Sequence, residues 1–219
     1  MPEVNVNLYN IASFVAFLLA LVLSISIHEF AHALVAEFQG DSTARYMGRL
    51  TLNPVAHFDP MGALMILFSA ISGFGFGWGK PVPVNPRNLR AGPRVGMGIV
   101  SAAGPLSNVL LAMLFAIPFR LHLHLPGLLG SLLHTVIWVN IGLAVFNLIP
   151  LFPLDGYSML RGILATIRTA WAYRWTDVLD SLQSVGPIIL ILFITMEQFL
   201  PISVLDLPRQ VLYRLIMGF

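Results

Sequence analysis

The sequence contains no cysteine among its 219 residues. Disulfide bonds are therefore excluded, and any bound zinc must be held by histidine, aspartate or glutamate. Charge is also scarce, because Asp, Glu, Lys and Arg make up 10% of the chain, against about a quarter in an ordinary soluble domain. Hydrophobic residues make up 57%, and the mean hydropathy is +0.83. This composition excludes a soluble globular domain and indicates a protein of the lipid bilayer.

The small positive charge of the chain does not indicate a nucleic-acid partner. The formal net charge is +2, and the arginines are spread through the predicted loops instead of forming one patch. This distribution suits contact with anionic lipid headgroups, so we expect the bilayer and not nucleic acid as a partner. No basic residue precedes the first apolar stretch, and we therefore do not expect a cleaved signal peptide.

Long stretches without Asp, Glu, Lys or Arg predict membrane helices. They cover residues 4–27, 60–79, 95–119, 121–154 and 181–196. The first continues helically to about Phe38 and ends at Gly40, and Pro126–Gly127 begins the helix of the fourth. The last extends past Glu197 to about Leu205.

These stretches predict an all-α polytopic membrane protein that forms one integral membrane domain over residues 1–219. We expect a core at about 10–160 and additional C-terminal helices at about 161–219. The stretch at 60–79 is a poor span because it ends in a glycine- and proline-rich run. We predict that it is a re-entrant helix followed by a strand-like loop, packed against protein or a water-filled cavity.

Charge placement supports the re-entrant prediction. If 60–79 returns to the side from which it starts, nearly all basic loop residues share that side, which the positive-inside rule makes cytoplasmic. These residues are Arg45, Arg49, Lys80, Arg87, Arg90, Arg94, Arg161, Arg168 and Arg174. The N-terminus is then predicted to lie outside and Gly40 inside.

The first apolar stretch contains the sequence His28-Glu29-Phe30-Ala31-His32. On a helix the two histidines lie one turn apart on one face, so both imidazoles can bind one Zn²⁺. Glu29 lies beside them, where it can accept a proton from a zinc-bound water. His28 is about ten residues from the cytoplasmic end, or ~15 Å, so the metal is expected within the membrane but open to cytosolic water. A buried histidine pair without metal is the alternative, and it is costly in lipid.

A catalytic zinc needs a third protein ligand and an open position for water. Asp155 is a candidate, because it follows the fourth apolar stretch in the sequence Pro153-Leu154-Asp155-Gly156. The same four residues are also typical of a turn. The residues alone therefore leave two interpretations of Asp155 open, a metal ligand and a turn aspartate.

The motifs together resemble the site-2 protease family of intramembrane zinc proteases. The resemblance covers roughly residues 20–160. It is carried by His28-Glu29-Phe-Ala-His32, Gly48-Arg-Leu-Thr-Leu-Asn53-Pro-Val-Ala-His57-Phe-Asp59-Pro, Gly79-Lys80-Pro-Val-Pro-Val-Asn85-Pro, Ala103-Gly104-Pro-Leu-Ser-Asn108 and Asn147-Leu-Ile-Pro150-Leu-Phe-Pro153-Leu-Asp155-Gly156. It implies Asp155 as the third zinc ligand and a three-helix catalytic core, matching the spans that hold His28, Asn108 and Asp155. The chain lacks the PDZ and CBS domains of longer relatives, so we expect a minimal form.

The resemblance implies a zinc metalloendopeptidase with one Zn²⁺ per chain in a multi-pass protein of a prokaryotic cell membrane. Glu29 is expected to be the general base, and Asn147 to donate to the oxyanion. For Asn147 a hydrogen bond between helices is the alternative interpretation. We expect single-span membrane proteins as substrates, whose helices must unwind locally before cleavage. The edge at 73–83 could pair with the unwound segment, which proline at Phe76 or Trp78 would prevent. The oligomeric state is not indicated.

Other polar residues and other functions were weighed as well. We expect a loop hydrogen bond for His57, interfacial positions for His122 and His124, and structural polar contacts for His134 and Asn140. One alternative function is a non-catalytic membrane protein that binds zinc or helices, although such a protein has no need of Glu29. Another is a peptidase of prenylated proteins, whose third ligand would have to be Glu197, near the predicted outer side.

Overall fold

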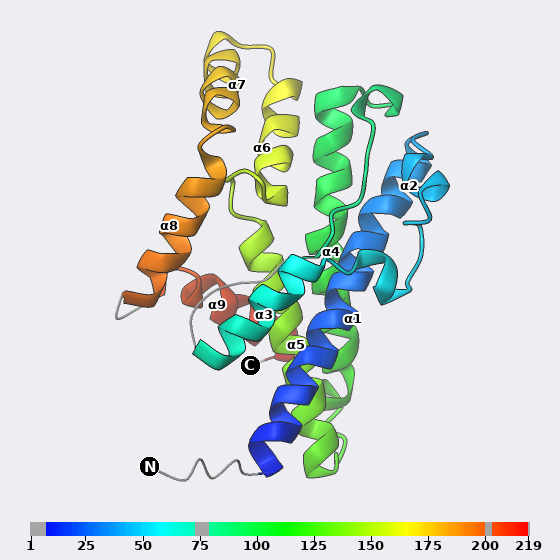
Figure 1. The fold of residues 1–219 in the computed structure, drawn as a ribbon, viewed down its shortest axis with the longest axis vertical. Helices are drawn as coiled ribbons and strands as arrows, with labels where there is room; N and C mark the ends of the chain where they lie inside the picture. Colours follow the sequence, from blue (N-terminus) through cyan, green and yellow to red (C-terminus); the bar gives the residue numbers. More distant parts are fainter. Residues whose placement is uncertain (1–7, 73–78, 200–202, 219) are drawn as a thin grey trace.

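The computed structural model describes residues 8–72, 79–199 and 203–218, and within these ranges it is helical with no β-strand (Figure 1). The fold is therefore all-α, as predicted. The helices are α1 (Leu8–Phe38), α2 (Thr43–Tyr46), α3 (Pro60–Ser72), α4 (Pro93–Arg120), α5 (Gly127–Asn147), α6 (Asp155–Thr166), α7 (Ala170–Leu182), α8 (Gly186–Phe199) and α9 (Asp206–Met217), with 3₁₀ turns η1 (Pro54–His57) and η2 (Pro86–Asn88).

Helices α1, α4 and α5 form the core and lie side by side (Figure 1). Each is long and apolar enough to cross a bilayer, with mean hydropathies of 2.1, 1.8 and 1.8 over the spans Ser13–Phe38, Pro93–Arg120 and Gly127–Asn147. Helix α1 contains no Gly or Pro, and the chain leaves it through Gly40 at φ 101°, a conformation that suits glycine. The polytopic membrane fold is thus confirmed.

The segment between η1 and residue 80 leaves the core and returns to the place where it began. Helix α3 has 13 residues, about 20 Å at 1.5 Å per residue, which is too short to cross. The backbone N–H of Lys80 donates to the carbonyl of His57 at 2.9 Å. The two ends of the segment are therefore adjacent, as a re-entrant segment requires. The predicted strand-like part with Phe76 and Trp78 lies outside the described residues.

The last membrane segment differs from the prediction of one helix from residue 181 to about 205. Ser181 lies at the end of α7, and α8 begins at Gly186, with an angle of 80° between the two helices. Pro187 explains the start of α8, because proline is favoured in the first turn of a helix and cannot continue a preceding one. Helix α7 is amphipathic: it buries Ala172, Thr176 and Leu179 and exposes Trp171, Tyr173 and Trp175.

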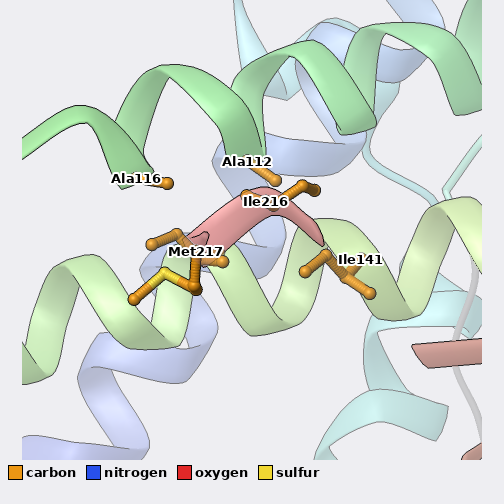
Figure 2. Close-up of a cluster of buried hydrophobic side chains, with 6 residues drawn as sticks. Ala112, Ala116, Ile141, Ile216 and Met217 are labelled. Carbon is orange, nitrogen blue, oxygen red and sulfur yellow. The ribbon is translucent and has the colours of Figure 1, made fainter. Parts of the chain in front are cut away.

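Two close contacts fix the outer helices on the core. Helix α9 inserts Ile216 and Met217 between α4 and α5, against Ala112, Ala116, Ile137 and Ile141 (Figure 2). Helix α6 packs closely on α4, since a Cβ at Gly98 would lie 2.9 Å from the Cα of Gly162. Small residues allow this close approach of helix backbones in a membrane. The close packing of α6 on α4 places Asp155, the first residue of α6, against the core.

Candidate active site

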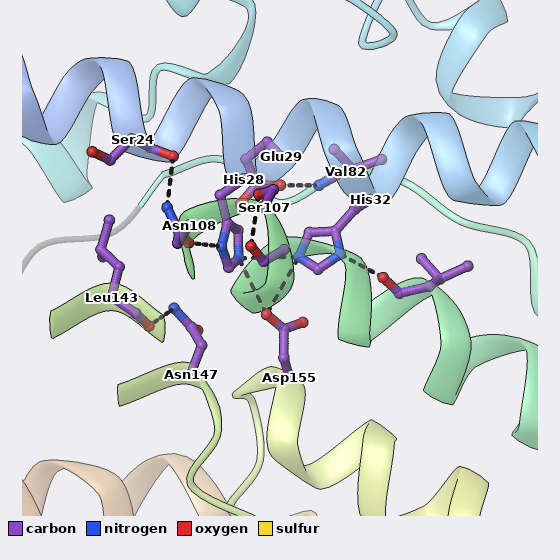
Figure 3. A network of polar contacts seen from close by, with 12 residues as sticks. Ser24, His28, Glu29, His32, Val82, Ser107, Asn108, Leu143, Asn147 and Asp155 are labelled. Atoms are coloured by element: carbon purple, nitrogen blue, oxygen red, sulfur yellow. Dashed lines mark hydrogen bonds and ion pairs between the residues drawn. The ribbon is translucent and has the colours of Figure 1, made fainter. Parts of the chain in front are cut away.

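Three side chains from two distant parts of the chain converge between α1, α4 and α6 (Figure 3). His28 and His32 lie one turn apart on α1, and their Nε2 atoms are 3.0 Å from each other. Asp155 Oδ2 is 3.1 Å from Nε2 of His28 and 3.3 Å from Nε2 of His32. Asp155 begins α6 and does not lie on the third span itself. The structure thus brings together the three residues that we predicted as metal ligands.

The hydrogen bonds behind the rings determine which nitrogens face the centre. Nδ1 of His28 is 2.6 Å from Oδ1 of Asn108, and Nδ1 of His32 is 2.8 Å from the carbonyl oxygen of Val100. Both oxygens accept hydrogen bonds, so each Nδ1 must carry the proton. In the neutral ring each Nε2 then carries the lone pair, which is the form in which imidazole binds a metal.

The orientation of the Asn108 amide is itself fixed by its partners. Nδ2 of Asn140 donates to the carbonyl of Val136 and to Oγ of Ser24, so Oδ1 of Asn140 faces Asn108. Nδ2 of Asn108 donates to this oxygen at 2.8 Å and to the carbonyl of Ser24 at 3.3 Å. Its own Oδ1 is left to accept from His28. A buried network across α1, α4 and α5 thus orients the ring, and Asn140 has the structural role that we expected.

The donor set fits a divalent cation. The Nε2 atoms of two imidazoles and a carboxylate oxygen face one another, and Oδ2 of Asp155 is buried without a hydrogen bond among the described residues. Such an arrangement is unfavourable unless a positive charge lies among the three atoms. Their separations of 3.0–3.3 Å match the ~3.3 Å edge of a tetrahedron with ligands about 2.0–2.1 Å from zinc.

Gly104 on α4 closes one side of this centre. A Cβ at this position would lie 2.4 Å from Nε2 of His32 and 2.6 Å from Nε2 of His28. These distances are far below van der Waals contact and close to the length of a bond to zinc. Glycine therefore keeps free the space in which the three ligand atoms meet. Asn108 lies one turn further on the same face of α4, which explains why both residues reach the site.

Glu29 is held by an extended segment that returns from the re-entrant loop (Figure 3). One carboxylate oxygen, Oε2, accepts a hydrogen bond from the backbone N–H of Val82 at 3.0 Å. The segment is anchored in turn by Arg49, which is buried and donates to the carbonyls of Lys80 and Pro81 at 2.9 and 3.1 Å. This chain of contacts fixes one oxygen of the Glu29 carboxylate.

A cavity of about 410 Å³ opens beside the centre. Its lining includes His28, Glu29 and Asn147, together with apolar residues of α5 and α8 such as Phe146 and Leu190. Nδ2 of Asn147 donates to the carbonyl of Leu143 at 3.0 Å, which uses one of its two amide protons. The structure thus places Asn147 at the cavity, and its role as oxyanion donor stays a prediction.

The remaining candidates lie in other surroundings. His57 is buried and its Nε2 donates to the carbonyl of Thr51 at 2.8 Å, which is the expected loop hydrogen bond. His134 contacts the hydroxyl of Tyr213 on α9. His122 and His124 are exposed in the loop after α4. Glu197 accepts from the backbone of Val204 and does not belong to the group formed by His28, His32 and Asp155.

The sequence analysis placed Asn108 on one of the core spans and missed its hydrogen bond to His28. The signal was present in the Gly104-x-x-x-Asn108 spacing, which puts a small and a polar residue on one helix face. The partner of Asn108 lies on another helix, 80 positions away, and no local pattern indicates it.

Comparison with known proteins identifies the family. The sequence profile of Peptidase family M50 matches residues 123–193. The candidate zinc metalloprotease YwhC of Bacillus subtilis is 41% identical over 154 residues, which cover 67% of this chain and 68% of YwhC. The chain belongs to peptidase family M50, the site-2 protease family. No solved structure matches this M50 protein significantly.

Two further M50 relatives are both called Rip2 and named as candidate zinc metalloproteases. The protein of Mycobacterium tuberculosis is 34% identical over 158 residues, and that of Mycolicibacterium smegmatis is 33% identical over 158 residues. The match covers 68% of this chain and 57% of each Rip2 protein. All three relatives are bacterial, which supports the predicted prokaryotic origin.

Proposed function

We propose that this M50 protein is an intramembrane zinc metalloprotease that cleaves single-span membrane proteins. The observation that carries the proposal is the convergence of His28, His32 and Asp155, with Nε2 of both imidazoles directed at one carboxylate oxygen. The histidines lie on a helix that is apolar enough to cross the bilayer. Family membership and the names of the relatives support the same chemistry.

His28, His32 and Asp155 would hold the Zn²⁺, which would supply a nucleophilic water at neutral pH and polarise the scissile carbonyl. Glu29 accepts the proton of the attacking water and passes it to the departing amine. The Val82 N–H holds one oxygen of Glu29, so the carboxylate does not need to reorganise during proton transfer. Asn147 lines the same cavity as His28 and Glu29, and it would donate to the developing oxyanion.

The surroundings of the site favour a membrane-spanning substrate over a soluble peptide. The cavity next to Glu29 is lined mainly by apolar residues, including Leu143, Phe146 and Ile191. A helical substrate hides each carbonyl in a hydrogen bond four residues away, so the segment to be cut must unwind first. The site is then reached from the cytoplasmic side, because the basic loops lie towards the end of α1 that carries the histidines.

The proposal is tested with the protein purified in detergent, loaded with zinc and incubated with tagged single-span membrane proteins. We expect cleavage by the wild type, and a loss of at least about 100-fold for Glu29→Gln, the lower range for removal of a general base. Zinc content, measured by mass spectrometry of the metal, should be unchanged in Glu29→Gln. Cleavage that survives this substitution would contradict the mechanism. Retained zinc without Glu29-dependent cleavage of any substrate would favour a non-catalytic zinc-binding protein.

A further inference from the structure

A second apolar groove runs along α1 and is not part of the catalytic cavity. It has a volume of about 550 Å³ and is enclosed by α1, η1 and the re-entrant helix α3. Residues that line it include Leu18, Val22, Ile25, Val55, Phe58 and Ile66. Val22, Val55 and Phe58 are 47%, 76% and 56% exposed, so this apolar surface is open to a ligand.

The groove is adjacent to the catalytic cavity. Ile25 and Gly79 line both of them. The groove residues Leu18, Val22 and Ile25 recur at helical spacing on α1, and Glu29 continues the same stripe one turn later. A chain that lies in the groove and continues along α1 therefore arrives at the general base.

Ile25 and Gly79 stand between the two spaces and pack against each other. A Cβ at Gly79 would lie 2.8 Å from Cγ2 of Ile25 and 3.4 Å from the carbonyl oxygen of His57. Residue 79 must therefore be small for this packing against Ile25, and a chain that runs from the groove to the cavity crosses this contact.

The polar groups of the groove are mostly in use already. Oγ of Ser26 donates to the carbonyl of Val22 at 2.7 Å, and Oδ1 of Asp59 accepts from the N–H of Gly62 at 2.8 Å. A polar side chain placed here would lose its water without gaining partners. Nδ1 of His57 has no hydrogen-bond partner among the described residues. This atom is buried, so it offers no partner to a bound chain.

We propose that this groove binds the apolar side chains of the unwound substrate on one side of the scissile bond. The catalytic cavity receives the chain on the other side. The inference rests on the proposed function and adds a specificity to it: large apolar residues are favoured on the groove side of the cleavage site, and charged residues are rejected there.

The first experiment fills the groove. Ala63 lines it from α3, and Ala63→Trp should raise KM about tenfold for a substrate with Leu or Phe near the cleavage site. Its kcat and zinc content should change less than twofold, and a substrate with Ala at those positions should be cut as by the wild type. Leu114→Trp is the matched control, because Leu114 is 58% exposed on α4 away from the groove. Equal kinetics of the two variants would overturn the inference.

The second experiment measures binding without cleavage. A photo-crosslinking residue is placed at Val22 or, as control, at Leu114, in the Glu29→Gln background. Crosslinks of a single-span protein at position 22 and not at 114 would support the groove. Crosslinks at 22 to lipid alone would overturn it, even if the wild type cleaves. Crosslinks of the protein at 22, combined with no cleavage by the zinc-loaded wild type, would instead overturn the proposed function and leave the groove as a helix-binding site.

Discussion

At the scale of single residues, the centre formed by His28, His32 and Asp155 depends on the lack of a side chain at Gly104 as well as on the three ligand candidates. The two imidazoles and the carboxylate meet in a space against which Gly104 of α4 packs without a side chain. The smallest possible addition, one methyl group, would occupy the position that the ligand atoms share.

We therefore expect Gly104→Ala to lower zinc affinity at least tenfold. The methyl group would have to displace one ring or the ion, because it would lie 2.4–2.6 Å from atoms of both histidines, well inside van der Waals contact. Zinc affinity is measured by competition with a chelator. Gly130→Ala is the control, since its Cβ would meet only Leu125 Cβ, at 3.9 Å. Equal zinc affinity in the two variants would show that Gly104 does not bound the site.

Some of these residues were predicted from the sequence and others were not, for a physical reason. His28, Glu29 and His32 are neighbours on one helix, so their joint geometry follows from the helical repeat. Asp155 approaches them through the packing of α6 on α4, which no local pattern encodes, and only the resemblance to a family indicated it as a ligand. The proton on Nδ1 of His28 depends on Asn108 and Asn140, and such a network emerges only in three dimensions.

At the scale of elements, the extended segment after the re-entrant loop is tied to the end of α1 by a single carboxylate. Asp41 is fully buried and accepts hydrogen bonds from the backbone and hydroxyl of Thr43, the backbone of Asn85 and the amide of Asn88. Burial raises the pKa of Asp41, but these hydrogen bonds outweigh it, and the pKa lies below its ordinary value.

This shift predicts how stability depends on pH. A carboxylate whose folded pKa lies below its unfolded value stabilises the fold above about pH 4. That contribution decreases as the pH falls through the folded pKa. The stability difference between wild type and Asp41→Asn should therefore be largest near neutral pH and shrink below about pH 4. Thermal unfolding in detergent at several pH values measures it, and a difference that does not vary with pH would contradict the role of the charge.

The elements themselves were largely predictable from their lengths and boundaries. The three long apolar stretches had no alternative to a helix in lipid, because every backbone group must be paired within its own segment. The 80° angle between α7 and α8 was missed, since hydropathy averages over a window and does not register a change of direction. The short turn at 183–185 and Pro187 produce that change.

At the scale of the whole molecule, the distribution of basic residues predicts how the protein is oriented in the bilayer. Exposed arginines gather at the end that holds the start of α4 and the end of α1, among them Arg45, Arg87 and Arg90. The opposite end carries the short loop between α4 and α5, with Arg120 at its start. The positive-inside rule therefore predicts that the first end lies in the cytoplasm.

The absence of native cysteine makes this orientation simple to test. Single cysteines at Thr169, between α6 and α7, and at Leu123, between α4 and α5, are exposed at opposite ends of the molecule. A membrane-impermeant maleimide should label Leu123→Cys in intact cells, and Thr169→Cys only after the cells are permeabilised. The reverse labelling pattern would show that the orientation in the bilayer is opposite to the predicted one. The site would then lie towards the outer side.

The proposed ligands come from two chain segments, with His28 near the beginning and Asp155 after the second loop of the core. A protein that enters the bilayer during synthesis thus presents both imidazoles long before the carboxylate exists. Until α6 has been synthesised and has packed on α4, the two histidines lack Asp155, the proposed third metal ligand. If these are the ligands, we expect a nascent copy of the protein to be inert towards neighbouring membrane proteins until α6 is in place.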